Sequence, residues 1–197
     1  VTAEDPQNEG LINGIVLDGD YLDGRRLMTN DTATLLDGVS GVSFYSGGGV
    51  SSLPVIDGLA DDRIKIKIDG MPITSACTNH MNPALSYIDP SAVGKINIFA
   101  GITPVSQGGD SIAGSISVES KNPEFSVPGQ GNIVKGSLSS FYRSNGNVLG
   151  ASANASFTSE NFSMSYSGNT VESDNYEDGN GDDVKSTKYK VRNNLLN

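Results

Sequence analysis

The sequence has no tryptophan, and only one cysteine and one histidine among its 197 residues. A single cysteine excludes an internal disulfide, and a single histidine leaves no convincing Ser-His-Asp set, so we expect no enzyme. No stretch approaches the roughly 20 apolar residues of a membrane-spanning helix, which still allows crossing by strands. Positive charge is also scarce: the net charge of -10 argues against nucleic acid as a partner, because phosphates repel an acidic surface.

Glycine is abundant instead, with 24 residues, and short apolar runs lie between Gly-rich turns, which favours a mostly β chain. The composition changes near residue 125. The first part has dense apolar runs, and in one of them Ile64, Ile66 and Ile68 alternate with lysines ahead of an Asp-Gly pair. This pattern predicts a half-buried strand that ends in a tight turn.

Two short helices are predicted in the first part. Residues 32–39 have helical spacing, with Asp31 or Thr32 as the N-cap and Gly38 or Gly41 as the stop. Residues 90–93 could open a second helix after Asp89. The first part therefore reads as a small α+β domain, with a small mixed sheet, short helices and Gly-rich loops.

The second part contains four segments of about ten residues that alternate apolar and polar side chains, as strands of an outer-membrane barrel do. Their apolar positions are Val134, Leu138 and Tyr142; Leu149, Ala151, Ala153, Ala155 and Phe157; Phe162, Met164 and Tyr166; and Tyr189 and Val191. Periodicity alone leaves one sheet of a soluble sandwich equally open. A short connection at 158–161 and a long acidic one at 173–186 suit the two ends of a barrel. Four strands cannot close one, so we expect a piece of a longer protein whose strand edges associate between copies.

Three metal-ligand residue types fall within five residues, at Cys77, His80 and Met81. Cys77 and Met81 are four apart and can point the same way on one helical turn. Thiolate and thioether together favour Cu(I) over cations that prefer oxygen. The alternative is a small buried thiol and a core-filling methionine, with His80 as an ordinary loop histidine.

The segment Asp178-Gly179-Asn180-Gly181-Asp182 imitates the start of a calcium-binding loop. Its sixth position is Asp183 instead of glycine, and its twelfth is Tyr189 instead of glutamate. We therefore read it as a solvated acidic loop.

Five blocks in the first part, in order and spacing, resemble the plug domain of TonB-dependent outer-membrane receptors. The blocks are Thr34-Leu35-Leu36-Asp37-Gly38-Val39-Ser40-Gly41-Val42, Leu53-Pro54-Val55-Ile56-Asp57-Gly58-Leu59 after Gly47-Gly48-Gly49, the strand and turn from Arg63 to Ile73, Ile88-Asp89-Pro90 with Lys95-Ile96-Asn97-Ile98-Phe99-Ala100-Gly101, and Gly108-Gly109-Asp110-Ser111-Ile112-Ala113-Gly114-Ser115-Ile116. Asp57 stands where the family usually has arginine, and Lys95 and Asn97 replace acidic residues.

This resemblance implies a location in the outer membrane of a Gram-negative bacterium, with the plug facing the periplasm, a barrel around it that contacts lipid, and energy from TonB. Residues 1–31 would lead from the TonB box region into the plug, 32–124 would form the plug core, and 125–197 the first barrel strands, about four antiparallel ones. Val1-Thr2-Ala3 looks like the tail of a TonB box that is otherwise missing.

Residues 71–90 are similar to the copper-receptor branch of the family, which carries a Cys-x-x-x-Met pair in its plug. The resemblance implies that Cys77 and Met81 are copper ligands, that His80 is a neighbour, and that a His-x-Met pair from the barrel, beyond Asn197, completes the site. Copper, with Cu(I) favoured, would be the transported ion and not a catalytic cofactor. The alternatives are a receptor for a siderophore or other organic ligand, and a soluble β-rich binding or adhesion fragment that uses the acidic loop.

Overall fold

The computed structural model describes residues 14–26, 28–46, 48–122, 125–129 and 131–196. The chain divides into two compact units, Val1–Lys121 (the first unit) and Asn122–Asn197 (the second unit). The division lies beside the composition change near residue 125. No helix in the described ranges is both long and apolar enough to cross a membrane.

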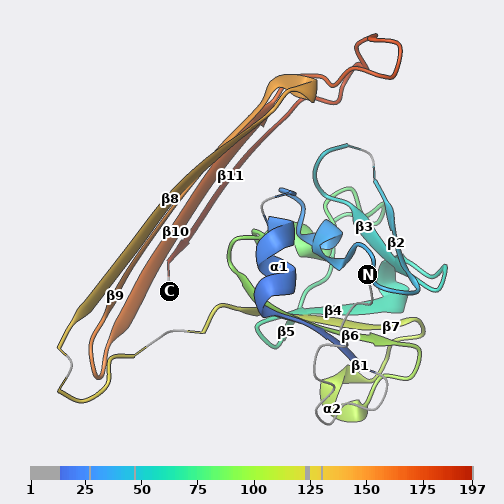
Figure 1. Ribbon diagram of the computed structural model, residues 1–197. Coiled ribbons are helices and arrows are strands. Elements are labelled where there is room, and N and C mark those ends of the chain that lie inside the picture. Colours follow the sequence, from blue (N-terminus) through green and yellow to red (C-terminus); the bar gives the residue numbers. More distant parts are fainter. Residues whose placement is uncertain (1–13, 27, 47, 123–124, 130, 197) are drawn as a thin grey trace. The chain divides into compact units, whose positions relative to one another are not determined.

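The first unit is built around a five-stranded mixed sheet with the strand order β1-β6-β7-β4-β5, in which β4 and β7 are parallel and the other neighbours antiparallel (Figure 1). A separate pair of strands, β2 and β3, forms a two-stranded sheet. The elements are β1 (Gly14–Leu17), α1 (Gly19–Arg26), η1 (Thr32–Leu36), β2 (Val42–Tyr45), β3 (Leu53–Ile56), η2 (Asp61–Arg63), β4 (Ile64–Ile68), β5 (Met71–Pro72), η3 (Ala84–Tyr87), β6 (Val93–Ala100), α2 (Val105–Gly108) and β7 (Gly114–Ser120).

The alternation in β4 gives the sheet its buried face. Ile64, Ile66 and Ile68 are buried in the core, whereas the two intervening lysines are half-buried, as predicted. The Asp69-Gly70 pair then turns the chain into β5 with positive φ at both residues, the geometry that a two-residue hairpin requires. This turn determines where the loop after β5 begins.

The helical prediction for residues 32–39 is confirmed in position but not in type or length, because η1 is a five-residue 3-10 helix. Its N-cap is Asp31, whose Oδ1 accepts from the Ala33 N–H at 3.1 Å. The helix predicted at 90–93 is wrong. Asp89 Oδ1 accepts from the Ser91 N–H at 2.9 Å and closes a turn instead, and β6 begins at Val93.

The second unit is a four-stranded antiparallel sheet with the order β11-β10-β9-β8 (Figure 1). The strands are β8 (Ile133–Arg143), β9 (Val148–Thr158), β10 (Ser163–Ser173) and β11 (Tyr189–Leu196), with a short 3-10 turn η4 (Asn145–Asn147) between β8 and β9. All four expected strands are therefore present. The fold class of a mixed α+β domain followed by about four antiparallel strands is confirmed.

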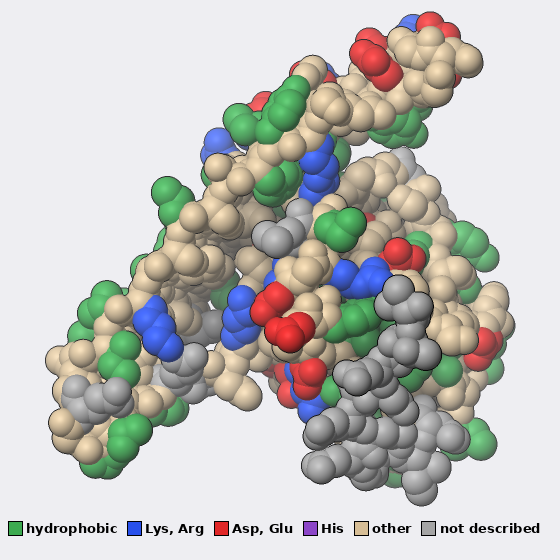
Figure 2. Space-filling view, in the orientation of Figure 1, with side chains coloured by type: hydrophobic (Ala, Val, Ile, Leu, Met, Phe, Trp, Pro, Cys, Tyr) green, Lys and Arg blue, Asp and Glu red, His purple; other side chains and the backbone are tan. Residues whose placement is uncertain are grey.

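The apolar face of this sheet is its exposed face. Leu138 of β8 pairs with Ala153, and Phe157 pairs with Val134 and with Met164 of β10. All of these side chains are exposed, whereas the alternating serine and asparagine positions of β9 and β10 are half-buried. Figure 2 shows apolar side chains standing out along this sheet. A sheet of a soluble sandwich would bury its apolar face, so this arrangement favours the barrel alternative.

One prediction for the second unit is wrong. Tyr189 and Val191 of β11 were expected to extend the apolar face, but Val191 pairs with Val171 and Tyr189 with Ser173, on the opposite face. Lys190 and Arg192 take the exposed apolar face instead, because they pair with Glu172 and Thr170.

Candidate metal centre

The Cys77 to Met81 segment lies in a loop between β5 and η3. At its start, the Ile73 N–H donates to the Ile66 carbonyl of β4 at 3.0 Å. At its end, η3 places Leu85 in the core with almost no exposed surface. The loop is therefore fixed at both ends by the first unit, and its middle is free to present side chains.

Local hydrogen bonds, and not a helix, shape the middle of the loop. Ser75 Oγ lies 3.1 Å from the carbonyl oxygens of both Cys77 and Asn82. The His80 N–H donates to the Cys77 carbonyl at 2.9 Å, and His80 itself has a φ of 49°. A non-glycine residue with positive φ does not continue a right-handed helix. The expectation that Cys77 and Met81 share one helical turn is therefore wrong.

The two sulfur side chains differ in exposure. Met81 is 74% exposed, so it does not fill the core of the first unit. Cys77 is a free thiol of intermediate burial. A half-buried thiol and an exposed thioether on one short loop are two soft ligand types.

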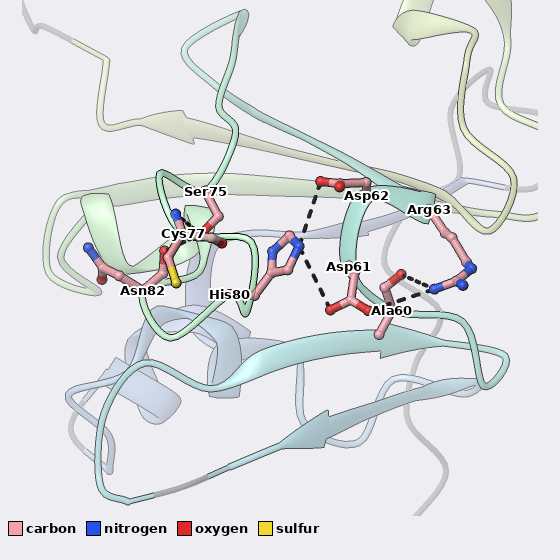
Figure 3. Close-up of polar contacts among 8 residues, drawn as sticks. All are labelled: Ala60, Asp61, Asp62, Arg63, Ser75, Cys77, His80 and Asn82. Carbon is pink, nitrogen blue, oxygen red and sulfur yellow. Dashed lines mark hydrogen bonds and ion pairs between the residues drawn. The ribbon is translucent and has the colours of Figure 1, made fainter.

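His80 is directed to another partner. Its Nε2 lies 3.7 Å from Asp62 Oδ1 and 3.9 Å from Asp61 Oδ1, and its side chain is only 11% exposed. Figure 3 shows the ring turned toward these two carboxylates and not toward the Cys77 sulfur. The two aspartates belong to η2, just before β4. His80 thus ties the loop to η2 in this structure, by an ion pair whenever the imidazole is protonated.

Sequence reasoning missed this acidic pair, because two adjacent aspartates are typical of a solvated surface and carry no motif. They lie far from His80 in the sequence, and only the return of the chain from β4 through β5 brings them together. No signal in the sequence marks that approach. In the part of the chain that the structure describes, no group of three or more His, Cys, Asp or Glu residues is placed to hold a metal ion.

Comparison with known families matches residues 12–115 to the model described as the TonB-dependent receptor plug domain. The match covers more than half of the chain and includes β1 and α1, which precede the blocks recognised in the sequence. It ends inside β7, the central strand that pairs with both β4 and β6.

The names of individual relatives specify different transported substances. The chain is 26% identical to the heme transporter BhuA of Brucella suis biovar 1 (strain 1330), over 89% of this chain and 26% of that protein. The solved structure of the copper transporter OprC is similar over 94% of this chain and 27% of that one, with a TM-score of 0.77 and 26% identity. The FrpB iron transporter from Neisseria meningitidis is similar in fold, with a TM-score of 0.71, 19% identity, and coverage of 93% and 28%. The chain spans about a quarter of the length of these relatives.

Proposed function

This chain belongs to the family of TonB-dependent receptor plug domains, and from that membership we propose that it is the N-terminal part of an outer-membrane receptor that imports copper. Receptors of this family reside in the outer membrane of Gram-negative bacteria and are transporters, not enzymes. Membership excludes the alternative of a soluble β-rich adhesion fragment. It also implies a partnership with TonB, which we propose for the whole protein. The expected TonB-box remnant at Val1-Thr2-Ala3 lies outside the described residues.

The observation that carries the copper proposal is the pair of sulfur side chains on one loop of the plug. Cys77 and Met81 are soft ligands four residues apart, and the loop is held by hydrogen bonds and by η3, with Met81 open to solvent. The similarity to the copper transporter OprC supports the same cargo. Two sulfurs bind an ion weakly unless further ligands close the site. We propose that residues outside this chain, on the barrel, supply those ligands.

A partial site of this kind suits transport. The plug would provide Cys77 and Met81, and any movement of the plug relative to the barrel would break the site and release the ion. His80 is engaged with Asp61 and Asp62, so we assign it to holding the loop and not to the ion.

The test is copper stoichiometry in the full-length receptor, measured by elemental analysis after purification from copper-fed cells. Cys77→Ala and Met81→Ala should each lose most of the bound copper. Met71→Ala is a matched control, because Met71 is also exposed and lies on β5 just before the loop. His80→Ala should retain copper. Unchanged metal content in both sulfur variants would reject the proposal.

The second candidate cargo is an organic iron ligand, favoured by the sequence similarity to heme transporters. Histidine, cysteine and methionine are all known axial ligands of heme iron, so the same loop could contact heme. The two cargoes separate in one experiment. A receptor that carries heme shows a Soret absorption band with iron as its metal, whereas a copper receptor shows neither.

A further inference from the structure

The exposed face of the second unit changes character at β11. On β8, β9 and the start of β10 this face carries apolar and small side chains. On β11 the same face carries Lys190 and Arg192, which are both exposed. Lys190 pairs with Glu172 and Arg192 with Thr170 of β10, so the register fixes which face they occupy.

The charges of Lys190, Arg192 and Glu172 on this face do not cancel. Lys190 Nζ donates to Glu172 Oε2 at 2.8 Å, and both side chains are about half exposed or more. Arg192 stands two residues further along the same face and pairs with Thr170. Two cations and one carboxylate leave an excess of positive charge on a face whose other side chains are uncharged and mostly apolar or small, in a chain whose net charge is -10. Such a surface complements an amphiphile with an anionic head.

Lys190 and Arg192 lie near one end of the sheet, in two neighbouring rows. One row across the sheet joins Tyr142, Leu149, Glu172 and Lys190. A second row, at the short-turn end, contains Val134, Phe157 and Met164. From Val134 to Tyr142 the strand runs about 26 Å. The tilt of roughly 35 to 45° in an outer-membrane barrel reduces this to about 18 to 21 Å along the membrane normal, most of the roughly 25 Å apolar band.

Aromatic rings mark both of these ends. Phe157 and Phe162 lie near the short turn, with ring centroids 6.3 Å apart, and Tyr142 lies in the row of Lys190. Rings of this kind sit at membrane interfaces. The Lys190 row is the one beside the long acidic connection, which is the extracellular end of such a barrel. The cations therefore sit at the level of the outer-leaflet headgroups.

We propose that Lys190 and Arg192 form a binding site for the phosphate of an outer-leaflet lipid, whose acyl chains cover the neighbouring apolar face. The inference rests on the outer-membrane placement of the proposed receptor, and is independent of its cargo. Long basic side chains lay their stems on apolar surface and direct their charge to the interface, and each basic residue near a charged membrane surface adds to anionic lipid binding. Glu172 holds Lys190 and weakens the attraction for the phosphate.

The test uses the full-length receptor in detergent and native mass spectrometry, with lipid A and enzymatically dephosphorylated lipid A as the two probes. The variant Lys190→Gln/Arg192→Gln should bind lipid A roughly tenfold more weakly. The matched control is Lys135→Gln/Lys185→Gln, which removes the same charge. Lys135 pairs with Ser156, on the opposite face of the sheet, and Lys185 lies in the long connection. The control should stay within about twofold of the unaltered receptor.

Glu172→Gln provides a change of opposite sign, because removing the carboxylate should strengthen lipid A binding. The dephosphorylated probe should not distinguish any of these variants. Equal lipid A binding by the Lys190/Arg192 variant and its control would overturn the proposal, as would a difference that persists without phosphate. Pairing of two receptors through this face, seen as a doubled mass that the variant abolishes, would also overturn it. Copper content is read in the same samples, so a wrong cargo is distinguished from a wrong lipid site.

Discussion

Strands of both units alternate apolar and polar side chains, but the first unit buries the apolar ones and the second exposes them. In the first unit, Ile64, Ile66 and Ile68 alternate with lysines and are each less than 10% exposed. In the second, Leu138 is 83% exposed and Leu149 is 62% exposed. An alternating sequence therefore establishes which residues share a face, but not what covers that face. The first unit supplies its own core, and the second needs an apolar environment from outside.

The largest expected difference between the units is the stability lost when one leucine in each is replaced by alanine. Leu36→Ala should destabilise the first unit by about 2 to 5 kcal/mol, because Leu36 is fully buried in the core and its removal leaves a cavity. Leu138→Ala should change the stability of the second unit in water by less than about 0.5 kcal/mol. Hydrogen exchange at increasing urea concentration, read separately on each unit, measures both. An equal cost for the two variants would show that the face around Leu138 is covered within this chain.

The sequence predicts the second unit well as far as strands and turns, because those depend on local alternation. It does not predict which face of the sheet each side chain of β11 occupies. Alternation fixes Tyr189 and Val191 relative to each other, but the register against β10 depends on the path of residues 174–188, which has no such pattern. The cations on the apolar face are visible only once Lys190 is paired with Glu172. The expectation that strand edges associate between copies stays a prediction, with β8 and β11 as the two edges.

The first unit was predictable where local chemistry dominates. The Asp69-Gly70 turn and the Asp31 cap follow from residue types. Helix α1 was missed, because Leu22 is its only buried residue and its sequence has no apolar stripe. In the candidate site, Cys77 and Met81 are proposed from their chemistry and their role stays a prediction. The position of His80 beside Asp61 and Asp62 depends on the tertiary path of the chain.

A smaller effect concerns Asp31, a carboxylate inside the first unit. Its Oδ1 caps η1 and its Oδ2 accepts from the buried Ser52 N–H at 2.7 Å. Asp31→Ala removes both acceptors and should cost about 2 kcal/mol. Asp37→Ala is the control, because Asp37 is mostly exposed and its ion pair with Arg25 contributes little. Urea unfolding of the first unit is the measurement, and similar losses for the two variants would contradict the assigned role.

The Asp31 effect has a defined pH dependence. Burial raises the pKa of Asp31 above its ordinary value of 3.8, and the hydrogen bonds from Ser52 and Ala33 only partly oppose this. With the folded-state pKa above the unfolded one, the contribution of this group is largest below pH 3.8 and decreases as pH rises through the folded-state pKa. The stability difference between the unaltered chain and Asp31→Ala should therefore narrow as pH rises through that range. A difference that widens would contradict the assignment.

The second unit contains a carboxylate whose pKa is lowered, opposite to that of Asp31. Its protonation is the smallest of the expected effects. Asp178 is fully exposed in the acidic connection, and the backbone N–H groups of Asp182 and Asn180 lower its pKa below 3.8. A lowered folded-state pKa means that the turn is held above pH 3.8 and loosens as pH falls through the lower value. NMR titration of the 197-residue chain in detergent should show the Asn180 and Asp182 amide protons shifting together below pH 3.8. Asp178→Asn should abolish that step, whereas Asp183→Asn, a neighbouring change of the same charge, should keep it. Persistence of the step in Asp178→Asn would show that another group controls this turn. The opposite pH dependence of a buried carboxylate in the first unit and an exposed one in the second would then no longer hold.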